Sequence, residues 1–394
     1  MNDNKIYLDN CASTRVGDEV LEAMLPFFTK EFGNASSVHR FGQQARAHVE
    51  EARLQVADFL GASPKEIVFT SGGTESDNMA IRGIAGYHRP KGNHIITSQI
   101  EHPAVLNTCK ALEKEDFTTT YLPVDSDGLV DLNQLKDAIT PQTILISIMH
   151  ANNEIGTLQP IKEIVEMAAH HQVLVHTDAV QTVGKIPVNV EDLGVDLLSM
   201  SGHKLHGPKG IGALYIRKVT KMRAMMAGGS HERNRRPGTE NVPGIVGFGK
   251  ACELAEQYLP LMDKDIRALR DRLEATVLST IAESRVNGHR VKRVPHVSNI
   301  SFAHVEGEGL LISLDLKGVA VSTGSACQSG ALEVSHVLTA LKLAPQWLQG
   351  ALRFSLSRYT TPQEIDTVLD KLTIIVQRLR EMSTTYAPRS HSSR

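Results

Sequence analysis

The sequence is short of cysteine, of aromatic residues and of net charge. Four cysteines, Cys11, Cys109, Cys252 and Cys327, stand alone among 394 residues and form no CxxC pair. We therefore expect reduced thiols, no disulfide framework and no metal site. Aromatic residues make up 5% of the chain and the formal net charge is −2. Because neither base stacking nor charge attraction is available, we expect no direct nucleic-acid binding.

Long apolar runs are missing as well. A helix that crosses a membrane needs about 20 consecutive apolar residues, whereas the longest runs here resemble residues 143–149. The first five residues lack the apolar core of a signal peptide. The sequence therefore predicts a cytoplasmic protein that has no membrane partner.

Short apolar runs instead alternate with amphipathic stretches between about residues 45 and 260. Apolar residues at helical spacing predict a helix over 45–60, with Gly61 as its C-cap, and another over 161–169. Buried strands are predicted at residues 67–69, 95–97, 144–149, 173–175 and 197–199. Such alternation is typical of an α/β fold whose mostly parallel central sheet is flanked by helices.

The chain is too long for one ordinary core, and its pattern changes after Pro260. We predict a large α/β domain over residues 16–260 and a smaller α+β domain formed by residues 1–15 and 261–383. In the smaller domain a helix is expected from about residue 263 to 283, strands near 297–302 and 318–322, and a last helix over 362–382. The polar tail at 384–394 is expected to be disordered.

The first chemical motif follows the strand at 67–69 and reads Thr-Ser-Gly-Gly-Thr-Glu at residues 70–75. A glycine turn that opens a helix leaves backbone N–H groups free, and the helix dipole favours an anion there. Gly73 and Thr74 are therefore candidate phosphate ligands. The alternative is a tight turn that Thr74 merely caps.

The second motif places Asp178 directly after the predicted strand at 173–175. A carboxylate at the carboxyl end of a parallel strand points into the crevice where α/β proteins bind ligands, and it suits a cationic ring nitrogen. Asp178 is equally compatible with a simple helix cap.

The third motif, Ser-Gly-His-Lys at residues 201–204, surrounds Lys204 with glycine and follows the strand at 197–199. A lysine held near apolar surroundings has a lowered pKa and suits Schiff-base chemistry. Ser201 and His203 are candidate phosphate donors. The alternative is a solvated loop lysine, and no carboxylate or cysteine nearby completes a metal site with His203 and His206.

The fourth motif surrounds Cys327 with serine and glycine over residues 322–331. Such a stretch cannot build a core, and exposure together with thiolate access favours reactivity. The alternative is that Cys327 is a small buried apolar residue, as free cysteines usually are.

Taken in order, these motifs resemble the pyridoxal-phosphate-dependent cysteine desulfurases of the NifS/IscS type, within the class-V aminotransferases of fold type I. The resemblance covers residues 7–358. It rests on Glu-His-Pro-Ala-Val at 101–105, Asn-Asn-Glu-Ile-Gly-Thr at 152–157, the motif at 201–204, Arg-Pro-Gly-Thr-Glu-Asn at 236–241 and Gly-Ser-Ala-Cys at 324–327. It implies the two-domain fold expected above and pyridoxal 5'-phosphate as the cofactor.

The resemblance also implies a role for each matching residue. Lys204 binds the cofactor covalently and moves a proton at the substrate, and Cys327 is the nucleophile and persulfide carrier. The remaining implied ligands are Asp178 at the pyridine nitrogen, Gln181 at the ring hydroxyl, His102 on the ring face, Gly73, Thr74, Ser201 and His203 at the phosphate with Thr239 from a partner subunit, and Asn34, Asn152 and Arg353 at the substrate carboxylate.

The implied reaction converts L-cysteine to L-alanine and leaves the sulfur on Cys327. The uninterrupted stretch 325–335 resembles the branch that supplies iron–sulfur cluster assembly and tRNA thiolation. The implied partners are L-cysteine, a second copy in a homodimer, and a sulfur acceptor or iron–sulfur scaffold protein. The alternatives are a selenocysteine lyase, a simple aminotransferase in which Cys327 is incidental, and a catalytically idle scaffold protein that kept the fold.

Overall fold

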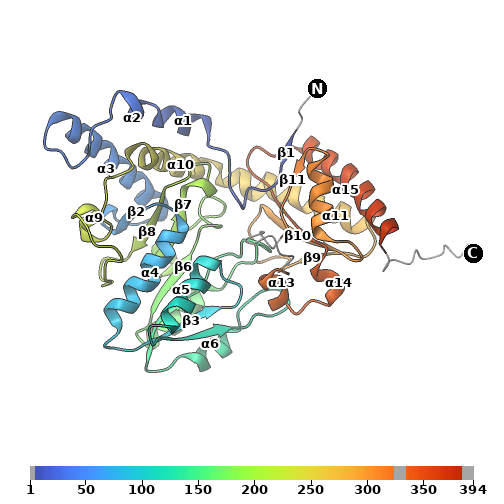
Figure 1. The fold of residues 1–394 in the computed structure, drawn as a ribbon, viewed down its shortest axis with the longest axis horizontal. Coiled ribbons are helices and arrows are strands. Elements are labelled where there is room, and N and C mark those ends of the chain that lie inside the picture. Colours follow the sequence, from blue (N-terminus) through green and yellow to red (C-terminus); the bar gives the residue numbers. More distant parts are fainter. Residues whose placement is uncertain (1–4, 324–333, 384–394) are drawn as a thin grey trace, which may run out of the picture.

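The computed structural model describes residues 5–323 and 334–383. Cys327 and the tail at 384–394, which was predicted to be disordered, lie outside the described residues. Two units lie side by side (Figure 1), one built around the central sheet and the other mostly from the last third of the chain. We call them the large unit and the small unit.

The large unit contains a seven-stranded sheet in the order β2-β8-β7-β6-β5-β3-β4. All its strands run parallel except β8, which lies antiparallel between β2 and β7. The strands are β2 (Ile67–Thr70), β3 (His94–Ser98), β4 (Thr118–Leu122), β5 (Thr143–Ser147), β6 (Leu174–Asp178), β7 (Leu197–Ser201) and β8 (Gly212–Ile216).

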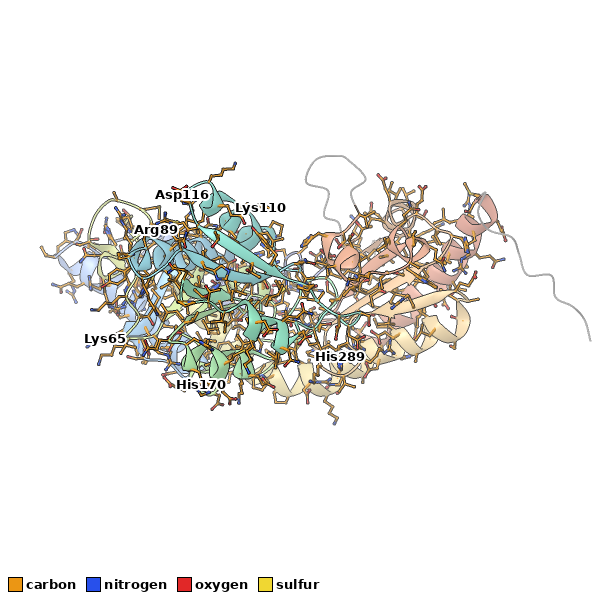
Figure 2. The ribbon with its side chains drawn as sticks, turned by 90° about the horizontal axis from the view of Figure 1, so that it is seen from below. Lys65, Arg89, Lys110, Asp116, His170 and His289 are labelled. Carbon is orange, nitrogen blue, oxygen red and sulfur yellow. The ribbon has the colours of Figure 1, made fainter. Side chains whose placement is uncertain are left out.

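Helices cover both faces of this sheet, because side chains alternate along each strand and both faces are apolar. Val68, Ile95 and Leu145 face α4 and α5, whereas the next residues along the same strands face α3, α7 and α10. Figure 2 shows these layers edge-on, with Arg89 and Lys110 beyond one face and His170 beyond the other. The helices of this unit are α1 (Asp18–Met24), α2 (Pro26–Thr29), α3 (Arg40–Leu60), α4 (Gly73–His88), α5 (Pro103–Glu113), α6 (Leu132–Ala138), α7 (Ile161–His170), α8 (Val190–Leu193), α9 (His231–Asn234) and α10 (Val242–Leu261).

The small unit has its own apolar core under a three-stranded antiparallel sheet in the order β12-β10-β9. The N-terminal strand β1 pairs in parallel with β11 beside it. Its elements are β1 (Ile6–Tyr7), α11 (Arg267–Thr280), β9 (Ser284–Asn287), β10 (Val297–Phe302), α12 (Gly307–Asp315), β11 (Val319–Ala320), α14 (Pro345–Leu348), β12 (Ala351–Ser355) and α15 (Pro362–Met382). Helix α13 (His336–Ala340) also lies in this stretch, but its Val337 and Leu338 are buried in the core of the large unit.

The predicted fold class is confirmed, and most elements lie within a few residues of their predicted bounds. Two details bear on the division at residue 260, which stays a prediction. Pro260 lies inside α10, and a π-helical turn, η3 (Met262–Ile266), joins α10 directly to α11. Among the described residues, no helix is long and apolar enough to cross a membrane.

The sheet brings five chain segments to one edge. The strands β2, β3, β5, β6 and β7 are parallel, so their carboxyl ends lie on the same side. The register aligns Thr70 with Gly212 and Gly212 with Ser201. A Cβ on Gly212 would lie 2.5 Å from the Met200 oxygen and 2.7 Å from the Gly72 Cα, so only glycine permits this close approach. The loops that follow these strands therefore share one crevice.

Candidate active site

A cavity of about 200 Å³ opens in this crevice. Eight of the residues predicted to bind the cofactor line it: Gly73, Thr74, His102, Asp178, Gln181, Ser201, His203 and Lys204. The sequence analysis did not single out four others, Asp77, Met149, Asn153 and Val180. Asp77 was detectable, because it lies one helical turn after Thr74 and so shares the face of α4 that Thr74 presents.

The α4 end of the cavity has the properties of an anion site. Gly72 has a φ of 154°, a backbone conformation that glycine adopts easily. A Cβ on Gly73 would approach Val180 Cγ2 to 2.8 Å and take up room in the cavity. The buried Ser201 hydroxyl has no hydrogen-bond partner among the described residues. Free N–H groups at a helix start and an unused hydroxyl are donors that suit a phosphate.

The acid side of the cavity contains Asp178 at the carboxyl end of β6 and Asp77 on α4. Burial raises the pKa of both carboxyls, and their mutual repulsion raises that of Asp77 further. The charges of His102 and Lys204 lower the pKa of Asp178, and neither group lowers that of Asp77. Of the two acids, only Asp178 therefore has neighbouring cationic groups that favour its charged form.

Lys204 belongs to a short 3₁₀ turn, η2 (Gly202–Lys204), that follows β7. Its Nζ donates to the carbonyl oxygens of Cys11 and Ala12, which belong to the N-terminal turn of the chain. Burial lowers the pKa of the Lys204 amine. A partly buried amine of lowered pKa is the form of lysine that serves as a nucleophile and a base.

The side chains of His102, His203 and Gln181 complete the walls of the cavity. Burial lowers the pKa of His102, and its Nδ1 accepts a hydrogen bond from the Ala104 N–H as the N-cap of α5. Burial and the charges of Lys204 and Lys209 lower the pKa of His203 to about 4, so this ring is neutral near pH 7. Gln181 Nε2 donates to the Cys11 oxygen at 3.1 Å.

The structure does not bring Asn152 into the cavity, contrary to the sequence prediction. Its side chain is fully buried, donates to the Ile100 oxygen at 2.9 Å, and accepts from the N–H groups of Glu154 and Ile155. The two bonds to Glu154 and Ile155 close the turn that follows Asn152, and the bond to Ile100 ties that turn to a neighbouring loop. The next residue, Asn153, lines the cavity instead.

Three other predicted residues do not line the cavity of their own chain. Asn34 is exposed and accepts a hydrogen bond from the Ser36 N–H at 2.8 Å. Thr239 is exposed on the loop after α9. Arg353 is buried in β12, where it donates to Asp9 Oδ1 at 2.7 Å and to the Asn153 oxygen at 3.1 Å. Because its guanidinium donates to Asn153, which lines the cavity, Arg353 lies next to the cavity.

Comparisons with known proteins decide the family. The family model described as Aminotransferase class-V matches residues 6–368. The chain belongs to the class-V aminotransferase family. Within this family, a protein named cysteine desulfurase IscS from Dictyoglomus turgidum is 54% identical over 382 residues, which is 96% of each chain. Another of that name, from Methanosarcina thermophila, is 53% identical over 96% of this chain and 93% of the relative.

Solved structures of class-V type agree with the fold. One named NifS-like protein has a TM-score of 0.90 and 41% identity, covering 95% of this chain and all of that one. A second, SspA in complex with cysteine, has a TM-score of 0.79 and 37% identity, covering 90% of this chain. These findings confirm the resemblance to the NifS/IscS type and the fold that it implied.

Class-V aminotransferases use pyridoxal 5'-phosphate, and the residues of the cavity fit this cofactor. The unpartnered Ser201 hydroxyl and the glycine turn match its phosphate, Asp178 matches its ring nitrogen, and the Lys204 amine matches its aldehyde. In the described part of the chain, no group of three or more His, Cys, Asp or Glu side chains is arranged to hold a metal ion.

Proposed function

We propose that this class-V enzyme is a cysteine desulfurase that converts L-cysteine to L-alanine and receives the sulfur as a persulfide on Cys327. The observation that carries the proposal is the 54% identity, over 96% of the chain, to a relative of that name. The cavity supports it, since the half-buried amine of Lys204 and the buried acid of Asp178 line the same space. The proposed sulfur acceptor is an iron–sulfur scaffold protein, with tRNA thiolation as a further use.

Eight cavity residues are proposed to hold the cofactor. Gly73, Thr74, Ser201 and His203 bind its phosphate, Asp178 pairs with its ring nitrogen, Gln181 binds its ring hydroxyl, His102 covers its ring and Lys204 binds it covalently. The bound cofactor supplies an electron sink for the charge that forms when the substrate Cα loses its proton. Asp178 keeps the ring nitrogen protonated, which strengthens that sink.

Lys204 is proposed to move the proton at the substrate Cα. Burial lowers the pKa of its amine, so a larger fraction is neutral and able to accept a proton near pH 7. The Cys11 and Ala12 carbonyls accept hydrogen bonds from its Nζ and so hold the amine in place. The two carbonyls thus position the Lys204 amine, whereas its burial keeps a larger fraction of it neutral and able to accept a proton.

Arg353 is proposed to bind the substrate carboxylate. Its planar fork matches a carboxylate in bidentate fashion, and its Nε is buried with no partner among the described residues. Asp9 and the Asn153 carbonyl hold the guanidinium in place. The role proposed for Asn34 at the same carboxylate has less support, because its side chain closes a local turn.

A homodimer is proposed because Thr239 is exposed rather than turned into its own cavity. The surface beside it is unusually apolar. Ser36 Oγ contacts His231 Nε2 at 3.1 Å, which joins the loop of Thr239 to the segment between α2 and α3. That segment and its flanks expose large apolar side chains: Leu25 54%, Phe28 58%, Phe32 67%, Val38 88% and Phe41 54%. Exposed patches of this kind are typical of an interface.

The test of the function is Cys327→Ser. The variant is expected to keep the visible absorbance of the bound cofactor and to stop forming alanine from L-cysteine. Cys109→Ala, which changes a buried thiol on α5, is the matched control and should keep both. Normal cysteine turnover by Cys327→Ser would contradict the persulfide role. Loss of cysteine turnover with retention of selenocysteine turnover would favour a selenocysteine lyase.

A further inference from the structure

Helix α13 begins shortly after residues 324–333, the segment of Cys327 that lies outside the described residues. The residues that open this helix contact the large unit rather than the small one. Val337 and Leu338 belong to the core of the large unit. The chain therefore passes from the segment of Cys327 onto the unit that contains the cavity.

Ser335 makes the first of these contacts. It is 6% exposed, and its Oγ donates to Glu154 Oε2 at 2.5 Å. The same oxygen accepts from the Leu338 N–H at 3.2 Å and so caps α13. Glu154 is itself 4% exposed. A short hydroxyl-to-carboxylate bond between buried groups is among the stronger hydrogen bonds in proteins.

His336 makes the second contact, through Nε2 and the Glu101 oxygen at 3.0 Å. Glu101 precedes His102, and Glu154 follows Asn153, and both of these neighbours line the cavity. The two contacts therefore fix the start of α13 to the loops that form the cavity wall.

The other side of the segment is fixed as well. Ser322 and Arg353 exchange backbone hydrogen bonds, at 3.2 Å from the Ser322 N–H and 2.6 Å from the Arg353 N–H. The described residues on both sides of 324–333 are thus bonded to loops of the cavity wall or to Arg353, which itself contacts Asn153 of that wall.

We propose that Ser335 and Glu154 are positioning residues for sulfur transfer to Cys327, because their hydrogen bond ties the described chain that follows residue 333 to the cavity wall. This inference rests on the proposed desulfurase function. In the transfer, a bond forms between Cys327 Sγ and the substrate sulfur while the substrate Cβ–S bond breaks. The electron pair of the broken bond stays with the carbon, which takes up a proton to give alanine. The reacting sulfur atoms must be aligned, and small misplacements cost large factors in rate.

A purely structural role predicts something different. If Ser335 served only to cap α13, its bond to the Leu338 N–H would suffice, and the bond to Glu154 would have no effect on transfer. Loss of a cap lowers stability whether or not the helix adjoins an active site.

The experiment uses the cofactor-loaded enzyme and the variants Ser335→Ala and Glu154→Gln. In a single turnover with L-cysteine, the mass of one added sulfur atom on Cys327 reports transfer. Titration with L-alanine, followed by visible absorbance, reports binding without transfer. We expect transfer to slow by about tenfold or more, with the affinity for L-alanine unchanged within about twofold. Ser335→Thr keeps the hydroxyl and should restore the rate.

Thr361→Ala and Glu364→Gln provide the matched control. Thr361 caps α15 with the same hydroxyl and Glu364 carboxylate pairing, at the exposed start of that helix. These variants remove a helix cap that does not adjoin the cavity and should keep the wild-type rate of transfer. Wild-type rates in Ser335→Ala and Glu154→Gln would overturn the inference, as would equal slowing in Thr361→Ala. A wild-type enzyme that forms no persulfide would overturn the proposed function itself.

Discussion

Glu101 carries a buried carboxyl whose protonation changes within an accessible pH range. It is 1% exposed, accepts from Ser98 Oγ at 2.6 Å and from the Met149 N–H at 3.0 Å, and faces the charge of Asp178. Burial raises its pKa from 4.5 to about 8. The hydrogen bonds act in the opposite direction but do not offset the loss of hydration.

The raised pKa makes stability depend on pH. The folded protein holds this proton more tightly than the unfolded chain, so the stabilisation is complete below about pH 4.5 and is lost as the pH rises to about 8. At about 1.36 kcal/mol for each pH unit, the interval between the two pKa values of Glu101 corresponds to about 5 kcal/mol. Above about pH 8 the contribution of Glu101 to stability no longer changes with pH.

Glu101→Gln removes this dependence, because glutamine does not titrate and retains an acceptor for the Met149 N–H. The free energy of unfolding of the variant, measured relative to wild type, should rise by about 5 kcal/mol between pH 4.5 and 8. Urea unfolding of both proteins, cofactor-loaded and at one protein concentration, gives this difference. Contributions of other groups, including Glu154 with its pKa near 7, cancel in it.

Glu115→Gln is the control, since Glu115 is 55% exposed and pairs with Arg82 at the surface. Because an exposed ion pair contributes less than about 1 kcal/mol, the variant's difference from wild type should stay within that limit over the same range. If the Glu101→Gln curve runs parallel to wild type between pH 4.5 and 8, the carboxyl of Glu101 is ionised in the folded protein and the reasoning is wrong.

Two further pairs of variants test the structure. Arg53→Met should cost about 3–5 kcal/mol, because it strips the buried Glu232 carboxylate of its bidentate partner. Glu50, which is 45% exposed, is a second partner of Arg53, and Glu50→Gln should cost less than about 1 kcal/mol. Equal urea midpoints for the two variants would contradict the greater importance of the buried pair between Arg53 and Glu232. Asn152→Ala should lower stability by about 2–3 kcal/mol through its lost turn bonds. Asn153→Ala should instead spare stability and weaken L-alanine binding, and the reverse pattern would restore the prediction made for Asn152.

Residues that follow a buried strand were the easiest to predict. Asp178 and Lys204 follow apolar runs, and in a parallel sheet the ends of such runs meet at one edge. Gly73 and Thr74 also follow a predicted strand, and they were singled out because a glycine turn that opens a helix has a recognisable sequence pattern. The order of strands and turns therefore pointed to these four positions, whereas His102 and Gln181 were implied only by the family resemblance.

The choice between neighbouring residues of one motif was not predictable in this way. Asn152 and Asn153 are chemically identical, and only the turn decides which of them faces the cavity. Because the Asn152 amide accepts two hydrogen bonds within that turn and donates a third to the Ile100 oxygen, Asn153 is left to face the ligand space. A pattern of residue types carries no information about that difference.

Contacts between distant segments were equally hidden, and the N-terminal turn is the clearest case. Asn10 and Cys11 bond to Ser355 of β12 in the small unit. A few residues later, Thr14 donates to the His203 oxygen of the large unit. The turn between them supplies the carbonyls that hold the Lys204 amine.

This arrangement gives the N-terminal turn more importance than its two-residue strand suggests. Arg353 is held by Asp9 at one end of the turn, and Lys204 is held by Cys11 and Ala12 in its middle. The group proposed to bind the substrate carboxylate and the group proposed to move its proton are therefore spaced by one short piece of backbone. A shift between the two units would change that spacing directly, so the turn links the arrangement of the units to the geometry of the reaction.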